Sequence, residues 1–276
     1  MKRAAILAAL LCVGAAPAPA PLRAPLRVVS INPCADSVLM RVADRGQIAA
    51  ISHYSHDPEA SSIPVTIARH FKATSGTAEE VVALAPDVVL SGQHVAPSTI
   101  LALRRMGVRL VQLPVPTTIA ESVAQVRLIA DTVGRPERGA VLAGAIERAV
   151  RAAEPADDRA IPALIWQGGG LVPGTDTLSS DMLRAGGFRN LSADYGLKNW
   201  DVLPLERLVA KPPRVLLTVG KGEGTGDRRL SHPVLRPLAR HMVRAAWPER
   251  LMHCGGPTIV DAMTRLRAIR SRLPAA

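Results

Sequence analysis

The feature of this sequence that most constrains its fold is an alternation of short β-branched runs with amphipathic stretches. Residues 27–31 (RVVSI) and 48–52 (IAAIS) have the composition of strands, as do residues 87–90 and 109–113. Helical patterns lie between these runs, and one of them begins at a capping box in residues 77–80. Strands that alternate with helices predict βα units, which form a mainly parallel sheet with helices on both faces.

Two consecutive helical stretches interrupt this alternation after residue 113. Residues 119–133 form the first pattern, Gly134 ends it, and Pro136 opens a second pattern that runs to about residue 153. At 1.5 Å per residue the second helix would be roughly 27 Å long. The βα pattern then resumes, with strands expected at 163–167, 214–219 and 250–254 and helices at 179–185, 204–210, 233–243 and 258–273.

The sequence therefore predicts an α/β fold in which two parallel-sheet lobes are joined by one long bridging α-helix. We expect residues 25–134 to form the N-terminal lobe, residues 135–156 the bridging helix and residues 157–276 the C-terminal lobe. Ligands of open α/β sheets bind outside the carboxyl ends of the strands, so the expected binding site is a cleft between the lobes.

The first residues have the three-part pattern of a cleavable signal peptide. Met1-Lys2-Arg3 is basic, residues 4–13 are apolar, and Val13-Gly14-Ala15 is the expected cleavage motif, with the cut before Ala16. The apolar stretch is too short to cross a bilayer, which takes about 20 residues. We therefore expect export of the chain, and we treat residues 1–24 as signal peptide and linker outside the fold.

The charge of the chain is strongly positive, with a formal value of +11 from 34 basic and 23 acidic residues. Of the basic residues 29 are Arg and 5 are Lys, and they are spread along the whole chain. A nucleic-acid-binding protein would gather them into a stripe, so no nucleic-acid partner is expected. A compositional bias toward Arg explains most of the charge, and an anionic ligand or a negative surface remains the alternative.

Motifs for catalysis are absent from the sequence. It contains neither H-E-x-x-H nor G-x-S-x-G, and the glycine-rich residues 220–226 fit neither a phosphate-binding loop nor a dinucleotide fingerprint. Those glycines indicate a flexible surface loop. His53 and His56 are too few for a protein metal site, which takes three or four ligands, and are interpreted as loop residues near a ligand. No catalytic residue and no metal ligand is assigned.

Cys34 and Cys254 each follow a predicted strand and precede a helix. They are expected to face a common cleft from opposite lobes. Two free thiols, a ligand contact and a disulfide are all open to them, and the disulfide is the least favoured because it would tie together lobes that must bind between them. The glycines at 168–170 allow either a close approach to a ligand or a tight turn.

Three segments together resemble one known family. They are RVVSINPCADSVLMRVADRGQIAAIS at 27–52, GTAEEVVALAPDVVL at 76–90 and LKNWDVLPLERLVAKPPRVLL at 197–217. Residues 27–272 resemble the periplasmic substrate-binding proteins for iron–siderophores, haem and cobalamin. These proteins serve ABC importers and have two α/β lobes bridged by one long helix. Thr77, where the family usually has Asn, is one departure from its pattern, and Pro213, where the family has Asp, is another.

The resemblance implies a location and partners for the chain. It is expected to act in the periplasm as a monomer, without a cofactor, and to deliver a metal chelate to the permease dimer of an ABC importer. An iron–siderophore and cobalamin are equally favoured as the ligand, ahead of haem. The alternative is a secreted enzyme on a similar two-lobe scaffold, which would need a nucleophile and a base in the cleft.

The resemblance also implies roles for particular residues. Glu79 and Glu206 match the two family glutamates, one on each lobe, that meet arginines of the permease. Aromatic residues in loops or at strand ends suit flat or aromatic chelates. The residues expected to bind the ligand are Tyr54, His94, Trp166, Gln167, Trp200 and His253.

Overall fold

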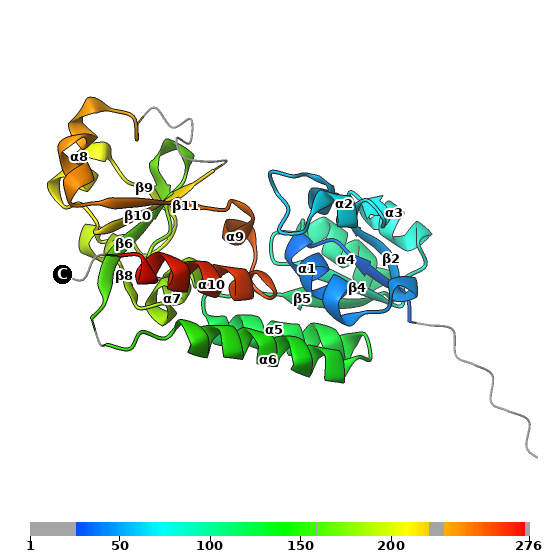
Figure 1. The fold of residues 1–276 in the computed structure, drawn as a ribbon. Helices are drawn as coiled ribbons and strands as arrows, with labels where there is room; N and C mark the ends of the chain where they lie inside the picture. Colours follow the sequence, from blue (N-terminus) through cyan, green and yellow to red (C-terminus); the bar gives the residue numbers. More distant parts are fainter. Residues whose placement is uncertain (1–25, 158, 221–228, 274–276) are drawn as a thin grey trace, which may run out of the picture.

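The computed structural model describes residues 26–273, apart from residue 158 and residues 221–228. Two α/β lobes lie beside each other, and a pair of long helices runs beneath both (Figure 1). The two parallel-sheet α/β lobes confirm the predicted fold class, and two helices connect them where one was predicted. The predicted signal peptide and the glycine-rich stretch after Gly220 lie outside the described residues.

A five-stranded parallel sheet with the strand order β3-β2-β1-β4-β5 forms the centre of the N-terminal lobe. Its strands are β1 (Val28–Ser30), β2 (Ile48–Ser52), β3 (Ala73–Thr74), β4 (Val88–Gly92) and β5 (Arg109–Leu113). Its helices are α1 (Pro33–Val42), α2 (Val65–Ala68), α3 (Ala78–Ala83) and α4 (Pro97–Arg105), with the short 3₁₀ helices η1 (Arg45–Gln47) and η2 (His53–His56).

The central strands of this sheet are apolar because helices cover both of its faces. Val29 pairs with Val89 across β1 and β4, and both side chains are fully buried. At the end of β1, the side chain of Asn32 accepts a hydrogen bond from the backbone N–H of Cys34, and Pro33 occupies the first turn of α1. A cap followed by proline at this position is typical of a helix start.

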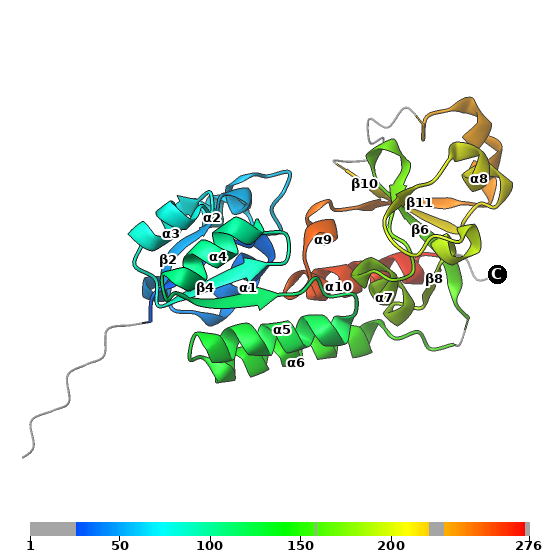
Figure 2. The ribbon, with the colours of Figure 1, turned by 180° about the vertical axis from the view of Figure 1, so that it is seen from behind.

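Two antiparallel helices, α5 (Ile119–Thr132) and α6 (Pro136–Ala153), connect the lobes (Figure 2). The N-terminus of α5 is held by the C-terminal lobe, since the backbone N–H of Ile119 donates to the Asp181 carboxylate at 2.8 Å. The N-terminus of α6 is held by the N-terminal lobe through Arg138, which pairs with Asp44 at 2.8 Å. The helix α6 then packs against the last helix of the C-terminal lobe, so it contacts both lobes.

The C-terminal lobe has a four-stranded parallel sheet in the order β11-β10-β6-β8 and a small antiparallel pair, β7-β9. Its strands are β6 (Ile161–Trp166), β7 (Leu171–Val172), β8 (Phe188–Asn190), β9 (Asp201–Val202), β10 (Val215–Val219) and β11 (Val243–Trp247). Its helices are α7 (Leu178–Ala185), α8 (Leu205–Ala210), α9 (Arg250–His253) and α10 (Thr258–Ser271), with the short helices η3 (Gly168–Gly170), η4 (Leu191–Tyr195), η5 (Pro233–Leu235) and η6 (Pro237–Arg240).

Two element predictions in the last part of the chain are wrong. The helix expected at 233–243 is replaced by the short helices η5 and η6, because Pro233 and Pro237 each begin a new turn and prevent a continuous helix. The strand expected at 250–254 is the helix α9, and the edge strand is β11 instead. Within β11 only Val243 is β-branched, so its composition gave little strand signal.

The helices of the described part of the chain include none that is both long enough and apolar enough to cross a membrane.

Candidate functional site

A cleft of about 890 Å³ lies between the two lobes. One wall consists of η2 and the loops that follow β1, β4 and β5, so it lies at the carboxyl ends of the N-terminal strands, where ligands of α/β sheets bind. The opposite wall comes from residues 176–179, 199–200 and 251–256. A smaller hollow of about 530 Å³ beside α7 shares Thr117 and Asp176 with the cleft.

Tyr54 is the most exposed aromatic residue of the N-terminal wall, with 52% of its surface accessible. It belongs to η2, and the His53 ring lies against it at a centroid distance of 4.1 Å. The ring of His53 is in turn 3.3 Å from the Thr74 carbonyl oxygen, measured from Nδ1. The predicted cleft tyrosine therefore faces the cleft from a short turn that its neighbours hold in place.

A buried carboxylate beneath η2 anchors this turn. Asp36 of α1 accepts a hydrogen bond from the backbone N–H of Ser52 at 3.0 Å and from the hydroxyl of Ser55 at 2.6 Å, both on its Oδ2 atom. The residue is 0% exposed, and burial raises its pKa to about 7 although these hydrogen bonds favour the charged form. Sequence inspection missed Asp36 because an acidic residue in the first turn of a helix is ordinarily a solvated one.

Trp200 is the corresponding aromatic residue of the C-terminal wall, and it is 41% exposed. The chain before it lies against residues 174–176, where the backbone N–H of Asp176 donates to the Lys198 carbonyl at 2.8 Å. Gly174 makes this approach possible, because a Cβ atom there would lie 2.3 Å from the Asn199 carbonyl oxygen. Tyr54 and Trp200 thus line the cleft from opposite lobes, as predicted.

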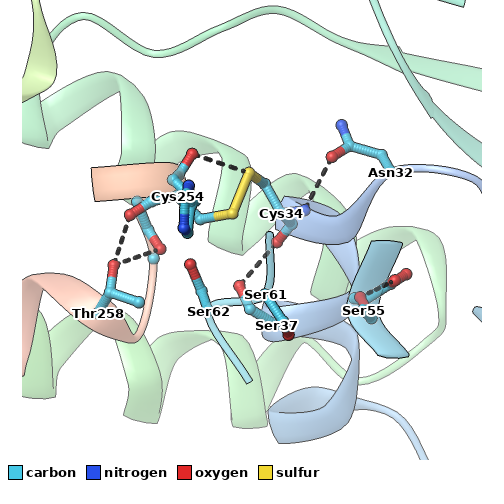
Figure 3. The surroundings of a disulfide bond; sticks show 12 residues. Asn32, Cys34, Ser37, Ser55, Ser61, Ser62, Cys254 and Thr258 are labelled. Carbon is cyan, nitrogen blue, oxygen red and sulfur yellow. Dashed lines mark hydrogen bonds between the residues drawn. A yellow bond between two sulfur atoms is a disulfide. The ribbon is translucent and has the colours of Figure 1, made fainter. Parts of the chain in front are cut away.

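A disulfide between Cys34 and Cys254 joins the two lobes (Figure 3). The sequence left this pairing open and disfavoured it because a disulfide would restrain the lobes. The structure shows why the bond is compatible with a cleft: it lies beside the connecting helices, where the lobes already touch. There the backbone N–H of Gly256 donates to the Ser122 hydroxyl of α5 at 2.7 Å, and the Ser62 hydroxyl donates to the Arg250 carbonyl at 2.9 Å.

His94 and His253 both line the cleft, on the N-terminal and C-terminal walls respectively. His94 lies in the exposed loop after β4, as expected. His253 reaches the cleft from the last position of α9, not from the end of a strand, and its Nε2 atom is buried without a hydrogen-bond partner. Within the described residues, no cluster of three or more His, Cys, Asp or Glu side chains could hold a metal ion.

Trp166 does not line the cleft, where the sequence predicts it to lie. It ends β6, where its side chain points into the C-terminal core and is only 1% exposed beside Leu203 and Leu216. Gln167 is likewise outside the cleft lining. Its backbone N–H closes the Gly168–Gly170 turn by donating to the Leu171 carbonyl at 2.8 Å, so those glycines form a tight turn.

Several polar residues of the cleft were not found from the sequence. Most of them lie in loops, as Gln93 follows β4 and Asp176 precedes α7, whereas Gln125 lies within α5. Isolated polar residues of this kind carry no periodic signal. The set comprises Asn32, Gln93, Gln125, Asp176 and Asn199.

Glu79 and Glu206 lie outside the cleft. Each is an exposed residue in the first turn of a short helix, α3 for Glu79 and α8 for Glu206. The two helices lie at the top of the two lobes, on the side away from α5 and α6 (Figures 1 and 2). The neighbouring Glu80 has an internal role, since its carboxylate accepts from the Thr74 hydroxyl at 2.9 Å and the Ser75 N–H at 2.8 Å.

Two parallel-sheet lobes around a shared cleft define a two-lobe ligand-binding protein. The family described as "Periplasmic binding protein" matches residues 28–255, and the chain belongs to this family. The family comprises binding proteins of haem, vitamin B12 and hydroxamate–siderophore transport, which are ligand-binding transport proteins that act in the periplasm.

Solved structures share this fold. The periplasmic heme-binding protein RhuT from Roseiflexus sp. RS-1 is 24% identical with a TM-score of 0.69, and the alignment covers 88% of this chain and 97% of that chain. The periplasmic vitamin B12 binding protein BtuF of Vibrio cholerae is 17% identical with a TM-score of 0.68, covering 90% of this chain and 98% of that chain. At these identities the likeness shows the fold alone.

A curated relative is a cobalamin-binding protein of Halobacterium salinarum. It is 28% identical over 200 residues, which is 70% of this chain and 54% of the relative. The chain therefore matches about half the length of that protein.

Proposed function

We propose that this chain is the solute receptor of an ABC importer and that it binds a metal chelate, either cobalamin or an iron–siderophore, in the cleft between its lobes. Haem is the less favoured ligand. The observation that carries the proposal is the cleft of about 890 Å³ with an exposed aromatic residue on each wall, Tyr54 and Trp200. Flat or aromatic chelates bind well to such faces, and the volume of the cleft lies within the range of ligand-binding pockets.

An enzymatic role is not favoured by the contents of the cleft. Its two cysteines, Cys34 and Cys254, are joined in the disulfide and offer no thiol nucleophile. The relatives with solved structures are named for the ligands they bind.

The position of the tryptophans gives a direct binding test. Of the three tryptophans, Trp166 and Trp247 are each 1% exposed, whereas Trp200 is 41% exposed. A bound chelate should therefore quench the Trp200 fluorescence, and the change Trp200→Phe should remove most of the quenching. Titration with cobalamin, ferric siderophores and haem measures this effect.

The affinity of the variants for the chelate gives a second test of the site. Loss of either stacking face, by Trp200→Ala or Tyr54→Ala, should weaken binding at least tenfold, which is about 1.4 kcal/mol. The buried Trp166 supplies the control, because Trp166→Phe should leave the affinity unchanged. Unchanged affinity in both alanine variants, for a chelate that the protein binds, would show that the cleft is not the site.

We further propose that Glu79 and Glu206 dock the receptor on its permease dimer, with the receptor acting as a monomer. One exposed acidic group at the top of each lobe can meet a basic partner on each permease subunit, and such pairs are sensitive to charge reversal. The double change Glu79→Arg with Glu206→Arg should abolish uptake in cells. In solution it should leave ligand affinity within about twofold, or ~0.4 kcal/mol.

The exposed residue Glu137, at the start of α6 on the opposite side, offers a matched control for this double variant. Glu137→Arg makes the same kind of charge change and should leave uptake intact. Normal uptake by the double variant removes the docking role, whereas a large loss of solution affinity would place the two glutamates at the ligand.

Export is proposed on the N-terminal sequence and on the family. Periplasmic material should begin after residue 15, with residues 1–15 removed. Mass spectrometry of that material checks the cleavage, and an intact Met1 in exported protein would contradict it.

A further inference from the structure

The charge of the cleft differs from that of the rest of the molecule. Lys and Arg make up 34 of the 276 residues, and the chain carries a formal charge of +11. Among the described residues that line the cleft, however, none is Lys or Arg, and Asp176 is the only carboxylate. Within the part of the chain that the structure describes, the basic side chains thus lie outside the cleft lining.

Four primary amides are among the described residues that line the cleft. Asn32, Gln93 and Gln125 come from the N-terminal wall or from α5, and Asn199 comes from the C-terminal wall. Gln93 and Asn199 are exposed. A primary amide has two N–H donors and one carbonyl acceptor, so it pairs with uncharged amide and carbonyl groups of a ligand.

Helix N-termini could supply positive potential without a basic side chain. At α1, however, the Asn32 side chain already accepts from the Cys34 N–H at 2.9 Å, and at α7 the Thr177 hydroxyl accepts from the Ser180 N–H at 3.3 Å. The helices α4 and α10 begin next to the cleft without a side-chain cap, and each such end is equivalent to about half a charge. This potential is too small to balance two or more carboxylates.

Metal chelates of similar size differ in the charge of their periphery. A corrinoid is rimmed by neutral amide groups, and a ferric trihydroxamate is neutral at its metal centre. Haem carries two propionate carboxylates, and a ferric tricatecholate carries three negative charges. An anion removed from water needs a cationic or hydrogen-bonded partner, and an unpaired one is strongly disfavoured.

We propose that this cleft selects chelates that carry no net negative charge and present amide or carbonyl groups, and that it discriminates against anionic chelates. This inference rests on the proposed function and narrows it to one charge class. The positive surface outside the cleft raises the encounter rate of anions, so the discrimination arises after encounter, because no Lys or Arg among the described residues of the cleft lining can neutralise the negative charge.

Calorimetric titration of the purified mature chain with four probes tests the charge class. The probes are cyanocobalamin, a neutral ferric trihydroxamate, a ferric tricatecholate and haemin, each at pH 8. At least one neutral chelate should bind 100-fold more tightly than both anionic ones. Equal or tighter binding of an anionic chelate would overturn the charge selection but keep the proposed function. Binding of none of the four would remove both.

A charge-adding variant tests the cause of the selectivity. Gln93→Arg places a cation on the exposed cleft wall and should strengthen binding of the anionic probes, relative to the neutral ones, at least tenfold. Ala140→Arg adds the same charge at an exposed position of α6 outside the cleft and should leave that ratio unchanged. If both variants give the wild-type ratio, cleft charge does not determine ligand choice and the inference is wrong.

Discussion

Asp36 is the residue whose environment departs most from that of an ordinary surface carboxylate. It is fully buried beneath η2, and it accepts hydrogen bonds from Ser52 and Ser55. These two residues flank His53 and Tyr54 in the sequence, whose rings lie against each other. Burial raises its pKa to about 7. The carboxyl group that holds the ligand-facing turn by hydrogen bonds is therefore also the group with the raised pKa.

The pH dependence of stability follows from this shift. Because the pKa of Asp36 is about 7 in the folded protein and 3.8 when unperturbed, the folded state binds more protons between these values. Stability should fall as pH rises, by roughly 3 kcal/mol between pH 5 and pH 8 from this group alone. Asp36→Asn should remove that slope and be the more stable protein at pH 8, as measured by urea unfolding.

Asp44 provides the control for this measurement. Hydrogen bonds from Arg135 and Arg138 lower its pKa below the usual range, so it stays ionised from pH 5 to pH 8. Asp44→Asn should retain the wild-type slope. A slope in Asp36→Asn equal to that of the wild type would contradict the assignment of the proton to Asp36.

Individual residues were predicted from the sequence where their position after a strand decided their exposure. Tyr54, His94 and Trp200 were placed in loops and line the cleft. The location expected for Trp166 differs from the structure, because Trp166 is the last residue of a central strand and such a residue can face either the core or the cleft. The side to which its side chain points depends on how the lobes pack, and the residues next to it in the sequence do not indicate this.

The paired helices α5 and α6 are the elements that define the relation between the lobes. They approach closely at Gly139, where an added Cβ atom would lie only 2.4 Å from the Cβ of Ala130. No side chain fits there without displacing one helix. Gly144 of the same helix meets only the far end of the flexible Arg148 side chain, at 3.2 Å.

Substitution by alanine should have opposite effects on stability at these two glycines. Gly139→Ala should destabilise the protein by about 1–3 kcal/mol through overpacking. Gly144→Ala should be neutral or stabilising by up to about 1 kcal/mol, because alanine favours a helix. Urea unfolding midpoints measure both, and equal midpoints for the two variants would show that α5 and α6 do not pack as described.

Helices with a strong hydrophobic periodicity were predicted well. Short elements whose structure depends on contacts distant in sequence were not. The pattern at 119–133 and the proline at 136 gave α5 and α6 nearly to the residue. The helix α9 was predicted as a strand and β11 was not predicted, because a segment of four or five residues is too short for periodicity to separate the two states. Pairing with β10 determines the state of β11, and that contact is not local in sequence.

At the scale of the whole molecule, the Cys34–Cys254 disulfide is the covalent link between lobes that otherwise meet along the connecting helices. It spans 220 residues of sequence, so it removes a large amount of freedom from the unfolded chain. Neither cysteine could be assigned to this bond from sequence, because pairing depends on how two separately folded lobes meet.

Removing this link should lower stability without changing the lobes themselves. By the chain-entropy model, a loop of this length corresponds to about 5 kcal/mol at most, and we expect Cys34→Ser with Cys254→Ser to lose about 2–5 kcal/mol in urea unfolding. Far-UV circular dichroism should be unchanged. An unfolding midpoint that is the same with and without reductant would show that the wild-type cysteines are not bonded.

The central claim is that the cleft between the lobes holds a metal chelate. Anomalous X-ray scattering from the cobalt or iron in crystals of the chelate complex locates the metal without reference to the protein's function. We expect one peak inside the cleft, between the walls that carry Tyr54 and Trp200. A peak confined to the outer surface of either lobe, with the cleft empty of metal in a complex that binds in solution, would contradict the account.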